Sequence, residues 1–117
     1  MFKDLEEKLI RFREERDWKQ FHSPRNLAAS ISIEAAELLE IFQWTDDARL
    51  PALVEARRSD IRDELADLCI YMITLAHDLD IDLRDAIEKK LARNAQRYPV
   101  ETSRGKATSN APRTTGD

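Results

Sequence analysis

Four acidic residues form two pairs with the same spacing: Glu34 with Glu37, and Glu64 with Asp67. A separation of three residues places both carboxylates of a pair on one face of a helix, one turn apart. Apolar or small residues surround both pairs, and neither Glu34 nor Glu37 has a Lys or Arg four residues away. Carboxylates held together repel one another, and a hard divalent cation such as Mg²⁺ is the usual means of neutralising them. The spacing therefore predicts a metal site.

A single Glu-x-x-Glu pair is more often a solvated helix face than a metal site. The second pair, on the next long helix, is what favours Mg²⁺ binding here. Glu40, three residues after Glu37, could join as a further acid, whereas Asp60 and Asp63 are expected to be exposed.

Other chemistries receive less support from the sequence. A di-iron bundle site needs Glu-x-x-His on two helices, and neither His22 nor His77 stands three residues after a Glu. The sequence has no Gly-x-Ser-x-Gly turn, no Walker A motif and no dinucleotide fingerprint. The single cysteine, Cys69, lies between Leu68 and Ile70 and is expected to be a core residue rather than a nucleophile.

The composition indicates one all-α domain. The 117 residues are 36% charged and 42% hydrophobic, with only two glycines and four prolines. The net charge of −4 argues against a nucleic-acid polymer as partner. No apolar run approaches the roughly 20 residues that span a bilayer, and the acidic N-terminus is unlike a signal peptide. We therefore expect a cytoplasmic protein without a membrane partner.

Apolar periodicity and capping signals predict the helices. The expected fold class is all-α, an antiparallel helical bundle of four main helices that is also oligomeric, with a domain over residues 1–100 and a polar, flexible tail over 101–117. Ser23 is the expected N-cap of the second long helix, with Pro24 at its first position, and Asp82 is the expected cap of the last. The expected helices span about 2–16, 24–42, 59–79 and 83–97, with a loop at 17–22 and a short helix starting near 50.

The third long helix carries apolar residues at steps of four and three, which is close to a coiled-coil seam. These residues are expected to face the core, with the carboxylates at its margin. Antiparallel packing of this helix against the preceding long one would let the two acidic pairs face each other. The seam consists of Ile61, Leu65, Leu68, Met72, Leu75 and Leu79, and the side expected to be buried on the preceding helix consists of Leu27, Ile31, Leu38 and Phe42.

The sequence resembles a known family over roughly residues 5–106. Glu34-Ala-Ala-Glu37-Leu followed by Glu64-Leu-Ala-Asp67 is similar to the metal signature of the MazG-like all-α nucleoside triphosphate pyrophosphohydrolases. Further segments resemble the dCTP pyrophosphatase branch of that family; they are residues 15–27, 40–44, 70–72, 89–94 and 97–100.

The resemblance implies a Mg²⁺-dependent enzyme that converts a deoxynucleoside triphosphate, dCTP or a modified dCTP, to the monophosphate and pyrophosphate for nucleotide-pool sanitation. It implies a homo-oligomer, a dimer or a dimer of dimers (a homotetramer), whose sites combine residues of more than one subunit. A carboxylate, Glu37 or Glu40, is expected to orient the attacking water. The implied Mg²⁺ ligands are Glu34, Glu37, Glu64 and Asp67, and the implied substrate-binding residues are Trp18, His22, Trp44, Tyr71, Lys90 and Asn94.

Several alternatives stay open. Trp18 and Trp44 lie at helix breaks, where a tryptophan is often a loop anchor, although base stacking on tryptophan contributes about 1–3 kcal/mol. Leu9 stands where cytosine-selective relatives can have a polar residue, so a broader or different nucleotide specificity is an alternative. Another is a non-catalytic helical interaction protein.

Overall fold

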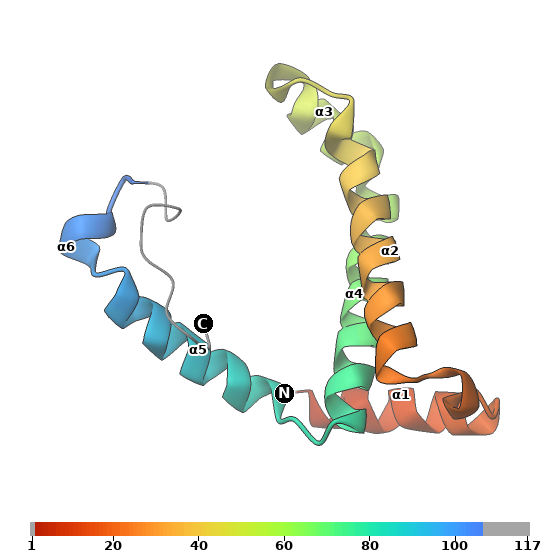
Figure 1. Ribbon diagram of the computed structural model, residues 1–117. Coiled ribbons are helices and arrows are strands. Elements are labelled where there is room, and N and C mark those ends of the chain that lie inside the picture. Colours follow the sequence, from red (N-terminus) through yellow and green to blue (C-terminus); the bar gives the residue numbers. More distant parts are fainter. Residues whose placement is uncertain (1, 107–117) are drawn as a thin grey trace. The chain divides into compact units, whose positions relative to one another are not determined.

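The computed structural model describes residues 2–106, and in that part of the chain the regular structure is entirely helical. The described residues divide into two compact units, residues 2–81 and 82–106. Among the described helices, none has the length and apolar character required to cross a bilayer. In order, the helices are α1 (Lys3–Glu15), α2 (Pro24–Gln43), α3 (Leu50–Ala56) and α4 (Arg58–Asp78) in the first unit, and α5 (Leu83–Arg97) and α6 (Val100–Ser103) in the second (Figure 1).

Local capping chemistry sets where the long helices begin. The Ser23 hydroxyl accepts a hydrogen bond from the backbone N–H of Asn26 at 3.1 Å, and Pro24 occupies the first turn of α2. The Asp82 carboxylate accepts the N–H of Asp85 at 3.0 Å in the same way at α5. Both predicted caps are confirmed. The predicted loop at 17–22 was wrong in part, because Lys19–Phe21 forms a 3₁₀ turn.

Helices α2 and α4 form the antiparallel pair that positions the acidic residues. The two helices lie side by side along most of their length, with α3 connecting them at one end (Figure 1). Leu27 of α2 is the most deeply buried apolar side chain described, at 1% exposure, and Ile73 and Ala76 of α4 are also buried. The antiparallel packing of these two helices is therefore confirmed. The predicted bundle of four helices stays a prediction, because α5 belongs to the second unit.

Helix α1 is joined to the C-terminal half of α4 by charged contacts. The Arg13 guanidinium donates two hydrogen bonds of 2.8 Å to the two carboxylate oxygens of Asp78, and the side chains are only 5% and 10% exposed. These hydrogen bonds lower the pKa of Asp78 below its ordinary value and raise the pKa of Arg13. A second contact joins His77 Nδ1 to the Glu6 carboxylate at 2.7 Å. The pair Arg13–Asp78 therefore fixes α1 against α4.

The apolar seam on α4 divides into two halves in the structure. Ile61, Leu68 and Leu75 are half-buried, whereas Leu65, Met72 and Leu79 are 50%, 41% and 48% exposed. The prediction that the whole seam is buried was thus wrong for the single chain. The physical reason is that α2 covers only one side of α4.

Cys69 is exposed, so the prediction that it is a core residue was also wrong. Its apolar neighbours, Leu68 and Ile70, are only partly covered themselves. Burial of Cys69 would require a second layer of helices over this side of α4.

Candidate functional site

Three of the four predicted metal ligands converge in the groove between α2 and α4. Glu34, Glu37 and Glu64 each offer a carboxylate oxygen, and these oxygens all lie within 4.8 Å of one another. Glu34 and Glu37 come from successive turns of α2, and Glu64 comes from α4. Asp67 is not part of this close group, although it lies near enough to act electrostatically on Glu34.

The electrostatics of the group indicate a deficit of positive charge. The pKa of Glu34 is raised, first because its protonated form can share a hydrogen bond with Glu64, then because of desolvation and the repulsion from Glu64. The Oε2 atom of Glu64 is buried and has no hydrogen-bond partner within residues 2–106. A buried oxygen without a donor is costly unless something neutralises it. Three converging carboxylates and an orphaned oxygen fit a hard divalent cation such as Mg²⁺.

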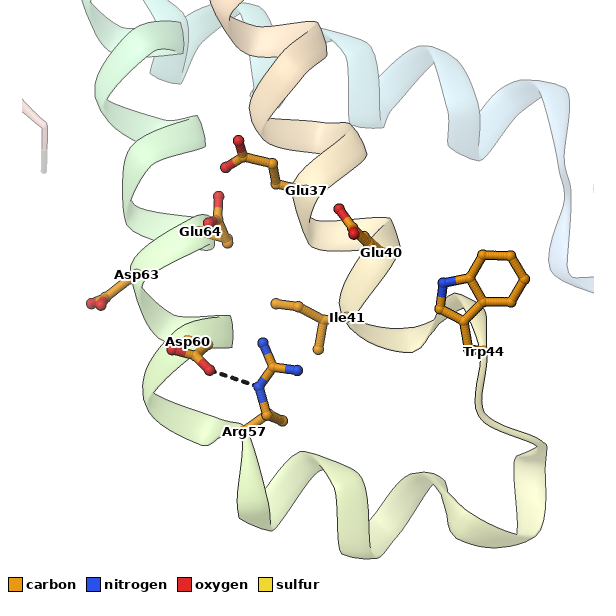
Figure 2. Close-up of a pocket in the computed structure, with 8 residues that line it drawn as sticks. All are labelled: Glu37, Glu40, Ile41, Trp44, Arg57, Asp60, Asp63 and Glu64. Carbon is orange, nitrogen blue, oxygen red and sulfur yellow. Dashed lines mark hydrogen bonds and ion pairs between the residues drawn. The ribbon is translucent and has the colours of Figure 1, made fainter.

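A cavity of about 610 Å³ opens beside this carboxylate group. That volume is in the range of small-molecule binding sites. Figure 2 shows Glu37 and Glu40 on α2 and Glu64 on the facing helix α4, with Trp44 at the edge of this group of residues. The lining residues are Glu37, Glu40, Ile41, Trp44, Arg57, Asp60, Asp63 and Glu64.

Trp44, the C-cap of α2, is 81% exposed. Its ring is not packed into the core of the chain, which argues against the loop-anchor interpretation. An exposed indole next to a cavity is suited to stacking on a planar group such as a nucleobase.

The other predicted binding residues of the first unit lie outside the lining of this cavity. Trp18 packs edge-on against Phe12, with ring centroids 5.7 Å apart, and Arg16 lies over both rings. His22 Nδ1 is 3.5 Å from a terminal nitrogen of Arg13. Burial, followed by the charge of Arg13, lowers the pKa of His22 and favours its neutral form. Tyr71 is half-buried on α4.

Lys90 and Asn94 lie on α5, in the second unit. Both side chains are half-buried. Around them, α5 carries the ion pairs Arg84–Glu88 and Asp85–Lys89, each joining residues one turn apart. The assignment of Lys90 and Asn94 to a binding site stays a prediction.

Sequence reasoning missed the contribution of Arg57 and Asp60 to the cavity. Asp60 and Asp63 are exposed, as expected, but both line this cavity. Arg57 stands seven residues before Glu64, a spacing that returns to the same face of a helix after two turns. That heptad relation was the signal in the sequence that could have identified Arg57.

Comparison with known proteins agrees with these features. The profile of the MazG-like family matches residues 29–109, and the chain therefore belongs to the MazG-like family. Among individual proteins, the chain is 45% identical over 98 residues to dCTP pyrophosphatase 1 of Rattus norvegicus and 42% identical over 95 residues to that of Homo sapiens. These alignments cover 82% and 80% of the chain but only 58% and 56% of the relatives, so the chain spans somewhat more than half their length.

A solved structure is similar along nearly its whole length. It is a pyrophosphatase from Archaeoglobus fulgidus, with a TM-score of 0.81 and 40% identity. The superposition covers 84% of this chain and 92% of that one. The all-α MazG-like fold expected from the sequence is thereby confirmed.

Proposed function

We propose that this protein is a Mg²⁺-dependent nucleoside triphosphate pyrophosphohydrolase that converts a deoxynucleoside triphosphate, dCTP or a modified dCTP, to the monophosphate and pyrophosphate. The observation that carries the proposal is the convergence of Glu34, Glu37 and Glu64 beside a nucleotide-sized cavity. The similarity to dCTP pyrophosphatase 1 supports the choice of base. Cleansing of the nucleotide pool in the cytoplasm is the proposed role.

The three carboxylates are the proposed Mg²⁺ ligands, with Asp67, which acts electrostatically on Glu34, as the proposed fourth. When bound, Mg²⁺ supplies positive charge that neutralises phosphate oxygens and makes the phosphorus more electrophilic. Without it, four acids and a polyanionic substrate would repel each other. Carboxylate oxygen ligands favour hard cations such as Mg²⁺ over softer metals.

Glu40 is the proposed residue that orients the attacking water, with Glu37 as the alternative. Glu40 lines the cavity but is not in the close carboxylate group, so its oxygens are available to accept a proton from water. Attack on the α-phosphorus forms a bond to the water oxygen and breaks the bond to the bridging oxygen. The water proton passes to the carboxylate, and pyrophosphate leaves intact.

Trp44 is the proposed stacking partner of the base, since its exposed ring borders the cavity. Trp18, His22, Tyr71, Lys90 and Asn94 are proposed as further contacts to the nucleotide. Trp18, His22 and Tyr71 do not line the cavity of one chain, which is consistent with sites that combine residues of more than one subunit.

We also propose that the protein is a homo-oligomer, a dimer or a dimer of dimers. Leu65, Met72 and Leu79 repeat every seven residues and leave an exposed apolar stripe on α4. A heptad-spaced stripe is what packs against another helix in a bundle. A second copy of this chain is the proposed occupant.

A panel of canonical and modified nucleoside triphosphates tests the proposed reaction. Each is incubated with the protein and Mg²⁺, and the products are separated and identified. We expect monophosphate and pyrophosphate from dCTP, and no turnover after chelation with EDTA. Release of orthophosphate, or no turnover of any triphosphate, would overturn the proposal and favour a non-catalytic interaction protein.

A further inference from the structure

Arg57 lies at the wall of the cavity beside the carboxylate group and is paired with a neighbouring carboxylate. Its Nε–H donates a 2.6 Å hydrogen bond to Oδ2 of Asp60, which follows three residues later. Figure 2 shows this bond and the two terminal nitrogens of the guanidinium directed away from Asp60, on the side of Ile41. Because the Arg57 side chain is 45% exposed and lines the cavity, these two nitrogens are accessible to a ligand there.

The charge around Arg57 points to an anion as that ligand. Five of the eight lining residues are acidic, and Arg57 is the one cation among them. A polyanion in this cavity would meet repulsion everywhere except at a metal ion and at Arg57. The planar guanidinium fork suits two phosphate oxygens at once, which an ammonium group cannot match.

The distance between Arg57 and the carboxylate group suits an extended phosphate chain. Arg57 and Glu64 are seven residues apart, about 10 Å along the helix axis at 1.5 Å per residue. Arg57 is therefore within reach of the remaining phosphates of a nucleotide held at Glu37 and Glu64 by one phosphate. Trp44 lies at another edge of the cavity, on the α2 side, which leaves room for the base there.

We propose that Arg57, oriented by Asp60, binds the pyrophosphate half of the nucleoside triphosphate and thereby selects triphosphates over monophosphates. The inference rests on the function proposed above and deepens it. Asp60 acts through Arg57 and is a positioning residue. Because the pair is about half exposed, its contribution to stability is small.

The test combines kinetics with equilibrium binding. Arg57→Gln removes the charge, Arg57→Lys keeps the charge without the fork, and Asp60→Asn weakens the orientation. KM and kcat are measured with dCTP, and dissociation constants are measured separately for pyrophosphate and for dCMP, each with Mg²⁺. Arg58→Gln is the matched control, because Arg58 makes an equivalent 2.6 Å bond to Glu55 but does not line the cavity.

We expect Arg57→Gln to raise KM for dCTP and the dissociation constant of pyrophosphate about tenfold, the usual loss for a charged hydrogen bond. Binding of dCMP should be unchanged by Arg57→Gln. Arg57→Lys should keep part of the affinity for pyrophosphate, and Asp60→Asn should weaken pyrophosphate binding less than Arg57→Gln does. Arg58→Gln should behave as the unmutated protein.

Equal weakening of dCMP and pyrophosphate by Arg57→Gln, or no weakening of either, would overturn this inference. The binding assays separate it from the function on which it rests. If the unmutated protein hydrolyses no triphosphate, the proposed function fails, whether or not Arg57 binds pyrophosphate.

Discussion

At the residue scale, the structure contains two kinds of charged cluster with opposite electrostatics. The carboxylates of Glu34, Glu37 and Glu64 converge within 4.8 Å of one another, and the pKa of Glu34 is raised, first by its contact with Glu64. Arg13 and Asp78, by contrast, satisfy each other through two hydrogen bonds while nearly buried. The first arrangement is unfavourable without a ligand and indicates function, whereas the second holds two helices together.

The Arg13–Asp78 pair predicts how stability depends on pH. The pKa of Asp78 is lower in the folded protein than its ordinary value of 3.8, first because of the Arg13 hydrogen bond. The stabilisation is therefore complete above about pH 4 and is lost as the pH falls through the lowered pKa. Asp78→Asn should lower the free energy of unfolding by about 3 kcal/mol at pH 7, since it leaves Arg13 buried without its counter-charge.

Urea denaturation at pH 7, 5 and 3 measures this effect at a fixed protein concentration. The difference between Asp78→Asn and the unmutated protein should shrink at pH 3. Glu88→Gln, which breaks an exposed pair on α5, is the control and should be unchanged. A difference that persists undiminished at pH 3, or no difference at pH 7, would show that the pair does not stabilise the fold.

At the element scale, the sequence predicted helix limits well because their signals are local. Ser23-Pro24 and Asp82 fix the starts of α2 and α5 through contacts within four residues. Burial along the α4 seam could not be predicted in the same way, since heptad spacing does not reveal which side the neighbouring helix covers. The carboxylate spacing predicted that Glu34, Glu37 and Glu64 lie close together. The position of Arg57 in the cavity wall depends on how α2 packs against α4, which the sequence does not specify.

Ser23→Ala should lower the free energy of unfolding by about 1 kcal/mol, because the N–H of Asn26 loses its acceptor. Chemical denaturation measures the change. Ser23→Asp keeps an acceptor at the same place and should retain most of the stability. Equal stability of Ser23→Ala and Ser23→Asp would contradict the capping role.

At the scale of the whole molecule, no other part of the described chain covers the exposed apolar stripe on α4. Few large side chains are fully buried within residues 2–106, and many apolar ones remain exposed. An exposed apolar surface of this kind usually marks an interface. Single-chain periodicity predicted the stripe, but it could not distinguish packing within one chain from packing between copies.

Met72→Glu places a charge in the middle of the stripe and should shift the protein toward the monomer. Sedimentation velocity measures the change in mass. Ser59→Glu adds the same charge at another exposed position of α4, outside the stripe, and should leave the assembly intact. A monomeric unmutated protein, or an assembly unaffected by Met72→Glu, would contradict the proposed oligomer.

The central claim is that the converging carboxylates bind the Mg²⁺ on which hydrolysis depends, and Glu64→Gln tests it most directly. Calorimetric titration of Mg²⁺ and assays of pyrophosphate release from dCTP are made on this variant and on Glu55→Gln, an exposed control outside the site. We predict that Glu64→Gln loses Mg²⁺ affinity and about 100-fold in kcat, because loss of a residue that merely supports a metal ligand already costs about 10–100-fold, while it keeps its fold and assembly. Mg²⁺ binding and turnover equal to those of Glu55→Gln would contradict the account.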